Sequence, residues 1–369
     1  MPTVIIRSAA YDDALTATFA GILDALGGRD IPRGGRVLVK PNLLSPARPE
    51  EAVLTHFSLV RAAVEYVLER GARPLVADSP AIGAFTRILK EGGLREALKD
   101  LPVECRPFEA SVAVDVGPPF GSIEIAREAV EADVILNLPK LKTHNAMLLT
   151  LGVKNLFGCV VGYRKPEWHM RTGVDRQMFA RLHVQICRRL NPAFTVLDGV
   201  LALEGEGPGK GGTPRPVGVL IGSRSPWAVD ACVCRMIGLP EGELPSLAAA
   251  TTAGLWPEAV ELDGDLPAVR DFRLPRPGPL IYGPKRVQGV VRRYLLRRPV
   301  CDAARCKLCG ECEKICPAGA IRTRDKALVF DYDRCIRCFC CGEVCPHAAL
   351  RSAETIAGAV LRRIAGKVL

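Results

Sequence analysis

Ten of the fifteen cysteines in this 369-residue chain fall between Cys301 and Cys345. Eight of them form two runs with the same spacing, C-x₂-C-x₂-C-x₃-C-P, one from Cys306 to Pro317 and one from Cys335 to Pro346. Three thiolates two residues apart can wrap a single loop around one face of an iron–sulfur cubane. Four thiolates also suit zinc, but zinc modules usually carry paired C-x₂-C units. The spacing therefore predicts iron–sulfur clusters.

The two runs together resemble the bacterial two-cluster ferredoxin domain, over about Cys301 to Arg351. The resemblance implies two 4Fe–4S clusters, and it implies that the fourth cysteine of each run reaches the other cluster. The implied ligands are Cys306, Cys309, Cys312 and Cys345 for one cluster, and Cys335, Cys338, Cys341 and Cys316 for the other. Cys301 and Cys340 fit neither register, so we expect neither to be a ligand; the alternative is a shifted ligand choice at Cys340.

Two such clusters conduct single electrons, so chemistry on a substrate is expected in the larger, cysteine-poor part of the chain. That part alternates helical patterns with short apolar runs, which are typical of strands buried on both faces. Asp12 and Ser58 are the predicted caps of the first two helices, and a further helix is predicted over 175–190. The alternation predicts an α/β fold, namely a three-layer body with a mainly parallel sheet, followed by a small α+β ferredoxin-like domain. The apolar runs begin at Val4, Arg36, Leu75, Val134, Phe194 and Val217.

Polar side chains that follow these apolar runs are the candidates for a site, because ligands of open parallel sheets bind beyond the carboxyl ends of the strands. Four lysines stand inside or beside strongly apolar sequence, where an unpaired ammonium is costly. Their convergence on one crevice would make an anion site. The candidate catalytic residues are Lys140, Lys142, His144 and His169, and the candidate substrate-binding residues are Lys40, Asn42, Asp78, Lys154, Asn155, Glu204 and Glu206.

Several of these residues also have a plainer interpretation. Asp78 precedes Ser-Pro, a combination that is typical of turns and helix caps. His144 and His169 are compatible with acid–base work, phosphate binding, metal binding or a purely structural role. The glycine-rich stretch from Glu204 to Gly212 lacks the spacing of a Walker A motif, so it is either an amide cradle for an anion or a flexible surface hairpin.

Four segments of the body, taken in combination, resemble the family called domain of unknown function 362, over about Val4 to Gly238. Members of that family are often fused to a ferredoxin module of this kind. The resemblance implies the architecture and supplies no reaction. The segments are Lys-Pro-Asn-Leu at 40–43, Asn-Leu-Pro-Lys-Leu-Lys-Thr-His at 137–144, Gly-Val-Lys-Asn-Leu-Phe-Gly at 152–158, and the stretch that begins at Asp198-Gly199 and ends in Glu-Gly-Glu-Gly-Pro at 204–208.

Composition and charge divide the chain into four parts. Hydrophobic residues at 48% and charged residues at 24% exclude a disordered or collagen-like chain. We predict a body over 1–284, a basic linker over 285–300, the ferredoxin domain over 301–352 and an amphipathic C-terminal helix over 353–369. The helix is expected to pack against the body, with binding to a membrane surface as the alternative. The net charge of +10 fits either an acidic partner or simple solubility.

These features predict an iron–sulfur protein that passes electrons through two clusters to an anionic substrate or small cofactor in the body. The alternative is a non-catalytic electron carrier or redox sensor whose body binds a partner or effector. A redox partner protein is expected, and nucleic acid is not, because the basic stretch lacks a recognised motif or an aromatic platform. No apolar run reaches the ~20 residues that cross a bilayer and no secretory signal is visible, so a cytoplasmic location is expected.

Overall fold

The computed structural model describes residues 1–162, 164–172, 175–256, 259–275, 297–357 and 359. The predicted basic linker lies outside the described residues except for 297–300, and so does the predicted C-terminal helix from 360 onward. No described helix is long and apolar enough to cross a membrane.

A mainly parallel, ten-stranded sheet forms the centre of the body, as predicted. Adjacent strands run parallel from β10 to β4, whereas β11 is antiparallel to both of its neighbours. The strand order is β12 (Glu261–Asp263), β1 (Thr3–Ser8), β11 (Gly212–Ser223), β10 (Phe194–Gly205), β7 (Val134–Leu138), β2 (Arg36–Pro41), β3 (Arg73–Asp78) and β4 (Glu104–Pro107). Two more strands complete it: β8 (Lys140–His144) is parallel to β10, and β9 (Leu148–Thr150) is antiparallel to β8.

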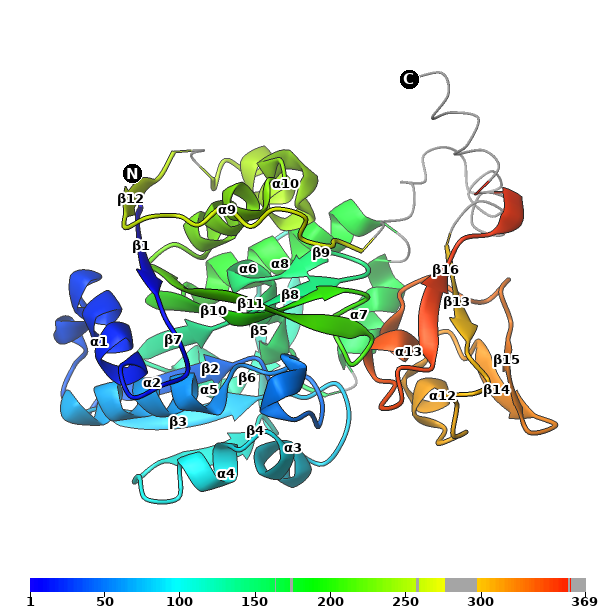
Figure 1. Cartoon of the computed structure of the whole chain (residues 1–369), viewed down its shortest axis with the longest axis horizontal. Coiled ribbons are helices and arrows are strands. Elements are labelled where there is room, and N and C mark those ends of the chain that lie inside the picture. The colour runs from blue at the N-terminus through cyan, green and yellow to red at the C-terminus, as the bar shows by residue number, and fades with distance from the viewer. Residues whose placement is uncertain (163, 173–174, 257–258, 276–296, 358, 360–369) are drawn as a thin grey trace.

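Helices cover both faces of this sheet, which gives the three predicted layers (Figure 1). Alternate residues of a strand point to opposite faces, so Ile5 of β1 packs into one apolar core while Val4 and Ile6 pack into another. The first core holds α1 (Leu15–Ala25) and α2 (Phe57–Glu69). The opposite face is covered by α8 (Arg176–Leu190), α9 (Pro226–Ile237) and α10 (Pro245–Thr252).

The shorter elements of the body lie mostly in the connections that follow the strands. Several of them carry side chains of the site described below. They are η1 (Gly28–Asp30), η2 (Pro49–Glu51), α3 (Phe85–Glu91), α4 (Leu94–Ala97), α5 (Arg127–Glu131), α6 (Gly152–Asn155), η3 (Leu156–Cys159), α7 (Arg164–Thr172), η4 (Glu241–Glu243), and a hairpin of β5 (Ser111–Asp115) with β6 (Ser122–Ala126).

Two of the predicted helix caps are wrong. The carboxylate of Asp12 accepts from the backbone N–H of Ala14 at 3.1 Å, so Asp12 lies two residues before the cap position, and the capping residue of α1 is Ala14 itself. The backbone N–H of Ser58 donates to the ring of His56 at 3.3 Å, so His56 caps α2. The helix predicted over 175–190 is confirmed as α8, and the side chain of Asp175 caps it. A side chain with an acceptor nitrogen therefore replaced the hydroxyl that the sequence pattern favoured at α2.

The C-terminal part is a small module of paired strands and short helices. Its first strand, β13 (Arg298–Cys301), pairs antiparallel with its last, β16 (Leu350–Ala353). Between them lie α12 (Glu311–Ile315), the hairpin of β14 (Ile321–Arg324) and β15 (Ala327–Phe330), and α13 (Cys340–Glu343). The module sits beside the end of the long β10–β11 hairpin (Figure 1), where an added Cβ on Gly209 would lie 2.5 Å from the carbonyl oxygen of Glu343. The lack of a side chain at Gly209 thus allows the backbone of the hairpin to approach the backbone of the module at Glu343.

Candidate functional site

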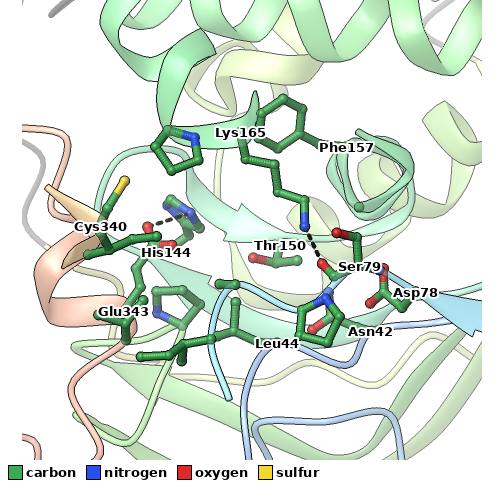
Figure 2. Close-up of a pocket in the computed structure, with 18 of the residues that line it drawn as sticks. Asn42, Leu44, Asp78, Ser79, His144, Thr150, Phe157, Lys165, Cys340 and Glu343 are labelled. Carbon is green, nitrogen blue, oxygen red and sulfur yellow. Dashed lines mark hydrogen bonds and ion pairs between the residues drawn. The ribbon is translucent and has the colours of Figure 1, made fainter. Parts of the chain in front are cut away.

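A cavity of about 450 Å³ lies where the body meets the module (Figure 2). The body supplies side chains from the carboxyl ends of β2, β3 and β8 and from α6, η3 and α7. The module supplies Glu311, Lys314 and Ile315 from α12, Cys340 and Glu343 from α13, and the adjacent Val344. The volume is typical of small-molecule sites, which usually lie at domain interfaces or beyond the carboxyl ends of strands.

A buried ion pair joins the ends of two neighbouring strands at one wall of the cavity. The Nζ of Lys40 on β2 lies 2.8 Å from Oδ1 of Asp78 on β3. The Asp78 carboxylate also accepts from the backbone N–H groups of Leu43 and Ser79, at 2.7 and 2.8 Å. An added Cβ on Gly158 would lie 2.4 Å from Asp78 and 2.6 Å from Lys40, so only glycine fits over the pair. Lys40 is therefore neutralised locally and contributes little free positive charge.

Three side-chain amides, those of the buried Asn137 and Asn155 and the half-buried Asn42, form a chain of hydrogen bonds that ends at the cavity. Nδ2 of Asn137 donates to the carbonyl oxygen of Gly152 at 2.9 Å. Nδ2 of Asn155 donates to Oδ1 of Asn137 at 2.8 Å, and Nδ2 of Asn42 donates to Oδ1 of Asn155 at 2.8 Å. Asn42 and Asn155 line the cavity. These hydrogen bonds fix the position of Asn42, and its Oδ1 has no hydrogen-bond partner among the described residues.

Three other lysines bring positive charge to the cavity, and in the part of the chain that the structure describes none of them has a carboxylate within ion-pair distance. Lys142 donates to the carbonyl oxygen of Val53 at 2.7 Å, and Lys165 donates to that of Ser79. Nζ of Lys154 lies 5.8 Å from the ring centre of Phe157. Burial lowers the pKa of all three, and lowers that of Lys165 to about 8. An anion in the cavity would stabilise their charged forms.

His144 joins the body to the module across the cavity. Its Nδ1 accepts from the backbone N–H groups of Ala146 and Met147 at 3.1 and 3.2 Å, so the ring proton belongs on Nε2. That Nε2 lies 3.1 Å from Oε1 of Glu343 on the module (Figure 2). Burial, followed by the charge of Lys154, lowers the pKa of His144. His144 is thus a neutral donor that holds Glu343.

Glu343 and His169 are two further titratable groups that line the cavity. Burial opposes ionisation of Glu343, yet its close electrostatic contact with His144 and the ammonium of Lys154 lower its pKa to about 2. The ring of His169, on α7, lies 4.2 Å from that of Phe179, and burial lowers the pKa of His169 to about 3. Near neutral pH the carboxylate is therefore charged and the imidazole is not.

Lys140, predicted to be catalytic, does not line the cavity. Its Nζ lies 2.9 Å from Oδ2 of Asp198 and donates to the hydroxyl of Tyr11 at 2.8 Å. The second carboxylate oxygen of Asp198 accepts from Tyr11 at 2.6 Å. Because Asp198 lies directly across from Lys140 in the β8–β10 pair, this lysine is buried and neutralised within the body.

Glu204 and Glu206, predicted to bind substrate, also lie away from the cavity. The Glu204 carboxylate is 2.9 Å from Arg215 and 2.7 Å from Arg273. Glu206 lies 3.8 Å from Arg297, at the start of the described part of the module. Both acidic side chains therefore serve ion pairs near the β10–β11 hairpin, and neither is among the residues that line the cavity.

Several residues that line the cavity were not among the predicted site residues, and those that bear on its chemistry include Ser79, Thr150, Lys165, Cys340 and Glu343. Thr150 ends β9 and is 4% exposed, and its Oγ1 has no hydrogen-bond partner among the described residues. Cys340 and Glu343 sit inside the second cysteine run, where their neighbours dominate the pattern. Lys165 follows the apolar stretch that ends near residue 163, and that position was its one available signal.

Four of the implied cluster ligands surround one small cavity in the module. Cys306, Cys309, Cys312 and Cys345 all line it, so the fourth cysteine of the second run meets the first run. The backbone N–H of Ala349 donates to Sγ of Cys345 at 3.3 Å. No three His, Cys, Asp or Glu side chains gather closely enough within the described ranges to hold a single metal ion. A 4Fe–4S cubane instead spreads four thiolates over four irons, which suits this wider frame.

The other four implied ligands also lie near one another. Burial, followed by the charges of Cys338 and Cys335, raises the pKa of Cys341, and Cys316 also contributes. The backbone N–H of Ala320 donates to Sγ of Cys316 at 3.3 Å, as amides do to cluster sulfurs. These contacts fit a second cluster frame. The two spare cysteines lie beside the frames: Cys301 is hydrogen-bonded to Cys306, and Cys340 to Cys338.

Comparisons with known proteins match both parts of the chain. Residues 37–235 match the model of a domain of unknown function, DUF362, and residues 298–346 match a 4Fe-4S dicluster domain. The thylakoid-associated protein sll1697 of Synechocystis is 36% identical over 271 residues, which cover 73% of this chain and 84% of that protein. The lactate racemase apoprotein of Thermoanaerobacterium thermosaccharolyticum superposes with a TM-score of 0.36 and 14% identity, over 52% of this chain and 50% of that one.

Proposed function

Because the chain belongs to the DUF362 family and carries a 4Fe–4S dicluster domain, we propose that it is an iron–sulfur oxidoreductase acting on an anion bound between its body and its module. The observation that carries the proposal is the cavity that both parts build. Lys142, Lys154 and Lys165 attract an anion from the body, while α13 forms the facing wall.

The short helix α13 connects the second cluster frame to the cavity. It begins at Cys340 and ends at Glu343, both of which line the cavity, and it includes the implied ligand Cys341. The thiol of Cys340 is also hydrogen-bonded to Cys338, another implied ligand. When bound, two 4Fe–4S clusters would supply single-electron transfer. The covalent path from the sulfur of Cys341 to the residues at the ends of α13 therefore spans one helical turn or less.

A reduction of the bound anion also needs protons, and Lys165 is the best placed group to give them. Its pKa of about 8 puts it close to the pH at which acid–base catalysts work best. His144 keeps its ring proton for Glu343 and is assigned a positioning role. A two-electron reduction would take two electrons from an external one-electron donor protein and two protons from solvent by way of Lys165.

The donor protein would meet the module at its first cluster frame. Cys309 is exposed, and Leu308 beside it is 37% exposed. Each frame has two buried cysteines, Cys312 and Cys345 in the first and Cys335 and Cys341 in the second, but the second has no exposed cysteine and its Cys341 lies in α13, whose end residues line the cavity. Electrons would therefore enter near Cys309 and leave toward α13. We retain the cytoplasm as the proposed location, because a reducing compartment preserves thiolate ligands.

The proposal is tested with anaerobically reconstituted protein that has been reduced and then mixed with a panel of carboxylates and phosphates. At least one anion should accelerate cluster reoxidation, and Lys154→Met and Lys165→Met should remove that acceleration while the visible absorption of the clusters stays unchanged. Lys99→Met, at an exposed lysine paired with Glu96 on the far side of the body, is the matched control. If no anion changes the reoxidation rate, the proposed oxidoreductase function is wrong, and an electron carrier or redox sensor is favoured.

A further inference from the structure

The amide chain that ends at the cavity has only one possible direction. Its inner end is the carbonyl oxygen of Gly152, which can only accept a hydrogen bond, so Asn137 must present its Nδ2 there. Asn137 then offers Oδ1 to Asn155, and Asn155 offers Oδ1 to Asn42. Lys40 also donates to Oδ1 of Asn155, at 3.4 Å, which supports the same order. The outer end of the chain is consequently the carbonyl oxygen of Asn42.

This outer oxygen lacks a partner. Oδ1 of Asn42 and Oγ1 of Thr150 are both buried side-chain atoms without a hydrogen-bond partner in the described part of the chain. Both residues line the same cavity, and Figure 2 shows them on the side facing Lys165. A buried acceptor without a donor costs ~1–3 kcal/mol, so a ligand that supplies the donor recovers that free energy. A fully deprotonated carboxylate or phosphate group cannot do so by itself, because all of its oxygens are acceptors.

We propose that the ligand is an anion that carries a hydroxyl or amino group next to its carboxylate or phosphate. The anion would meet the ammonium groups of Lys154 and Lys165, and the hydroxyl or amino group would donate to Oδ1 of Asn42. Thr150 offers a hydroxyl that can donate to or accept from the same ligand. This inference rests on the proposed function, since it assumes that the cavity binds an anion. It adds the chemical class of the substrate.

The test compares matched pairs of small anions on the full-length reconstituted protein by calorimetry. The probes are glycolate against acetate, and glycerol 3-phosphate against propyl phosphate, so that the carboxylate and phosphate cases are separated. In at least one pair the hydroxylated member should bind about tenfold or more tightly, as a site built to pair with a substrate hydroxyl discriminates. Asn42→Ala should erase the preference without weakening the member that lacks the hydroxyl.

Thr150→Val, which keeps the shape and removes only the hydroxyl, serves as a second variant in case Asn42→Ala perturbs folding. It should reduce the preference by severalfold while leaving the melting temperature unchanged. Equal binding of both members of each pair would overturn this inference and leave the anion site standing. A preference that survives both substitutions would overturn it as well. Failure of all four probes to bind would overturn the inference together with the proposed function.

Discussion

Gly158→Ala is expected to be strongly destabilising, although it adds a single methyl group. Its Cβ would lie 2.4 Å from Oδ1 of Asp78, 2.6 Å from Nζ of Lys40 and 2.9 Å from Cε of Lys40. The carboxylate cannot easily retreat because it also holds the backbone N–H groups of Leu43 and Ser79. The ammonium is anchored as well, by the carbonyl oxygen of Pro41 at 2.8 Å. The methyl group must therefore separate a buried ion pair or displace η3.

The size of the effect follows from that pair. Removing one partner of a buried ion pair costs ~3–5 kcal/mol, because the other charge is left without compensation. The alanine stretches the Lys40–Asp78 pair without removing a partner, so we expect a loss of about 2–4 kcal/mol in the free energy of unfolding. Denaturant unfolding followed by far-ultraviolet circular dichroism measures the loss.

Gly21→Ala provides the matched control. Gly21 lies within α1, and an added Cβ there has no atom within 4 Å. Alanine is favoured over glycine by ~1 kcal/mol in a helix interior, so this variant should be slightly more stable than the wild type. If Gly158→Ala unfolds within about 0.5 kcal/mol of the wild type, an amount typical of a neutral surface substitution, the inferred packing over the ion pair is incorrect.

Three further predictions concern the cavity and its module wall. Anion affinity should fall as the pH rises through about 8, where Lys165 loses its proton, and Lys165→Met should flatten the profile measured by calorimetry. Cys340→Ala removes a thiol hydrogen bond to Cys338. A hydrogen bond of ~1 kcal/mol corresponds to about 40 mV, so the reduction potential of one cluster should become more negative by that amount. An unchanged potential in a potentiometric titration would contradict this. Glu343→Ala removes the contact between α13 and Nε2 of His144, so the rate of amide hydrogen exchange in α13 should rise. Glu343→Gln keeps an acceptor for that nitrogen and should leave the rate unchanged.

Much of the fold was predictable because the central strands are buried on both faces. Such strands must be continuously apolar, and the runs at Val37, Leu75 and Ile135 therefore stood out from the turns around them. The caps were harder to predict. Ser58 carries a favoured capping hydroxyl, yet it lies inside α2, and the ring of His56 caps the helix by accepting from the backbone N–H of Ser58. A local sequence pattern predicts which residues can cap a helix. Which of them does so depends on the backbone conformation just before the helix begins.

The candidate site was predictable where it depends on single strands. Lysines within apolar sequence had to be paired or functional, and Lys40, Lys142 and Lys154 do line one cavity. Lys140 gave the same signal but is neutralised by Asp198, which lies across from it on a strand far along the chain. Only the strand order, which places Asp198 beside Lys140, distinguishes this lysine from those that line the cavity. The module wall was unpredictable for a related reason, because Glu343 reaches the cavity through a contact between two separately folded regions.

Cys340 and Glu343 make the module a structural component of the cavity wall, so under the proposed function it would help to enclose the anion that it reduces. A freely diffusing ferredoxin could donate electrons of the same energy, yet it would leave the lysine-lined cavity open on one side. If the cavity binds the proposed anion, fusion of the two domains in one polypeptide would be required to enclose it, beyond any gain in the rate of encounter. Evolution of a new specificity would have to alter both domains together, since each of them shapes the same space.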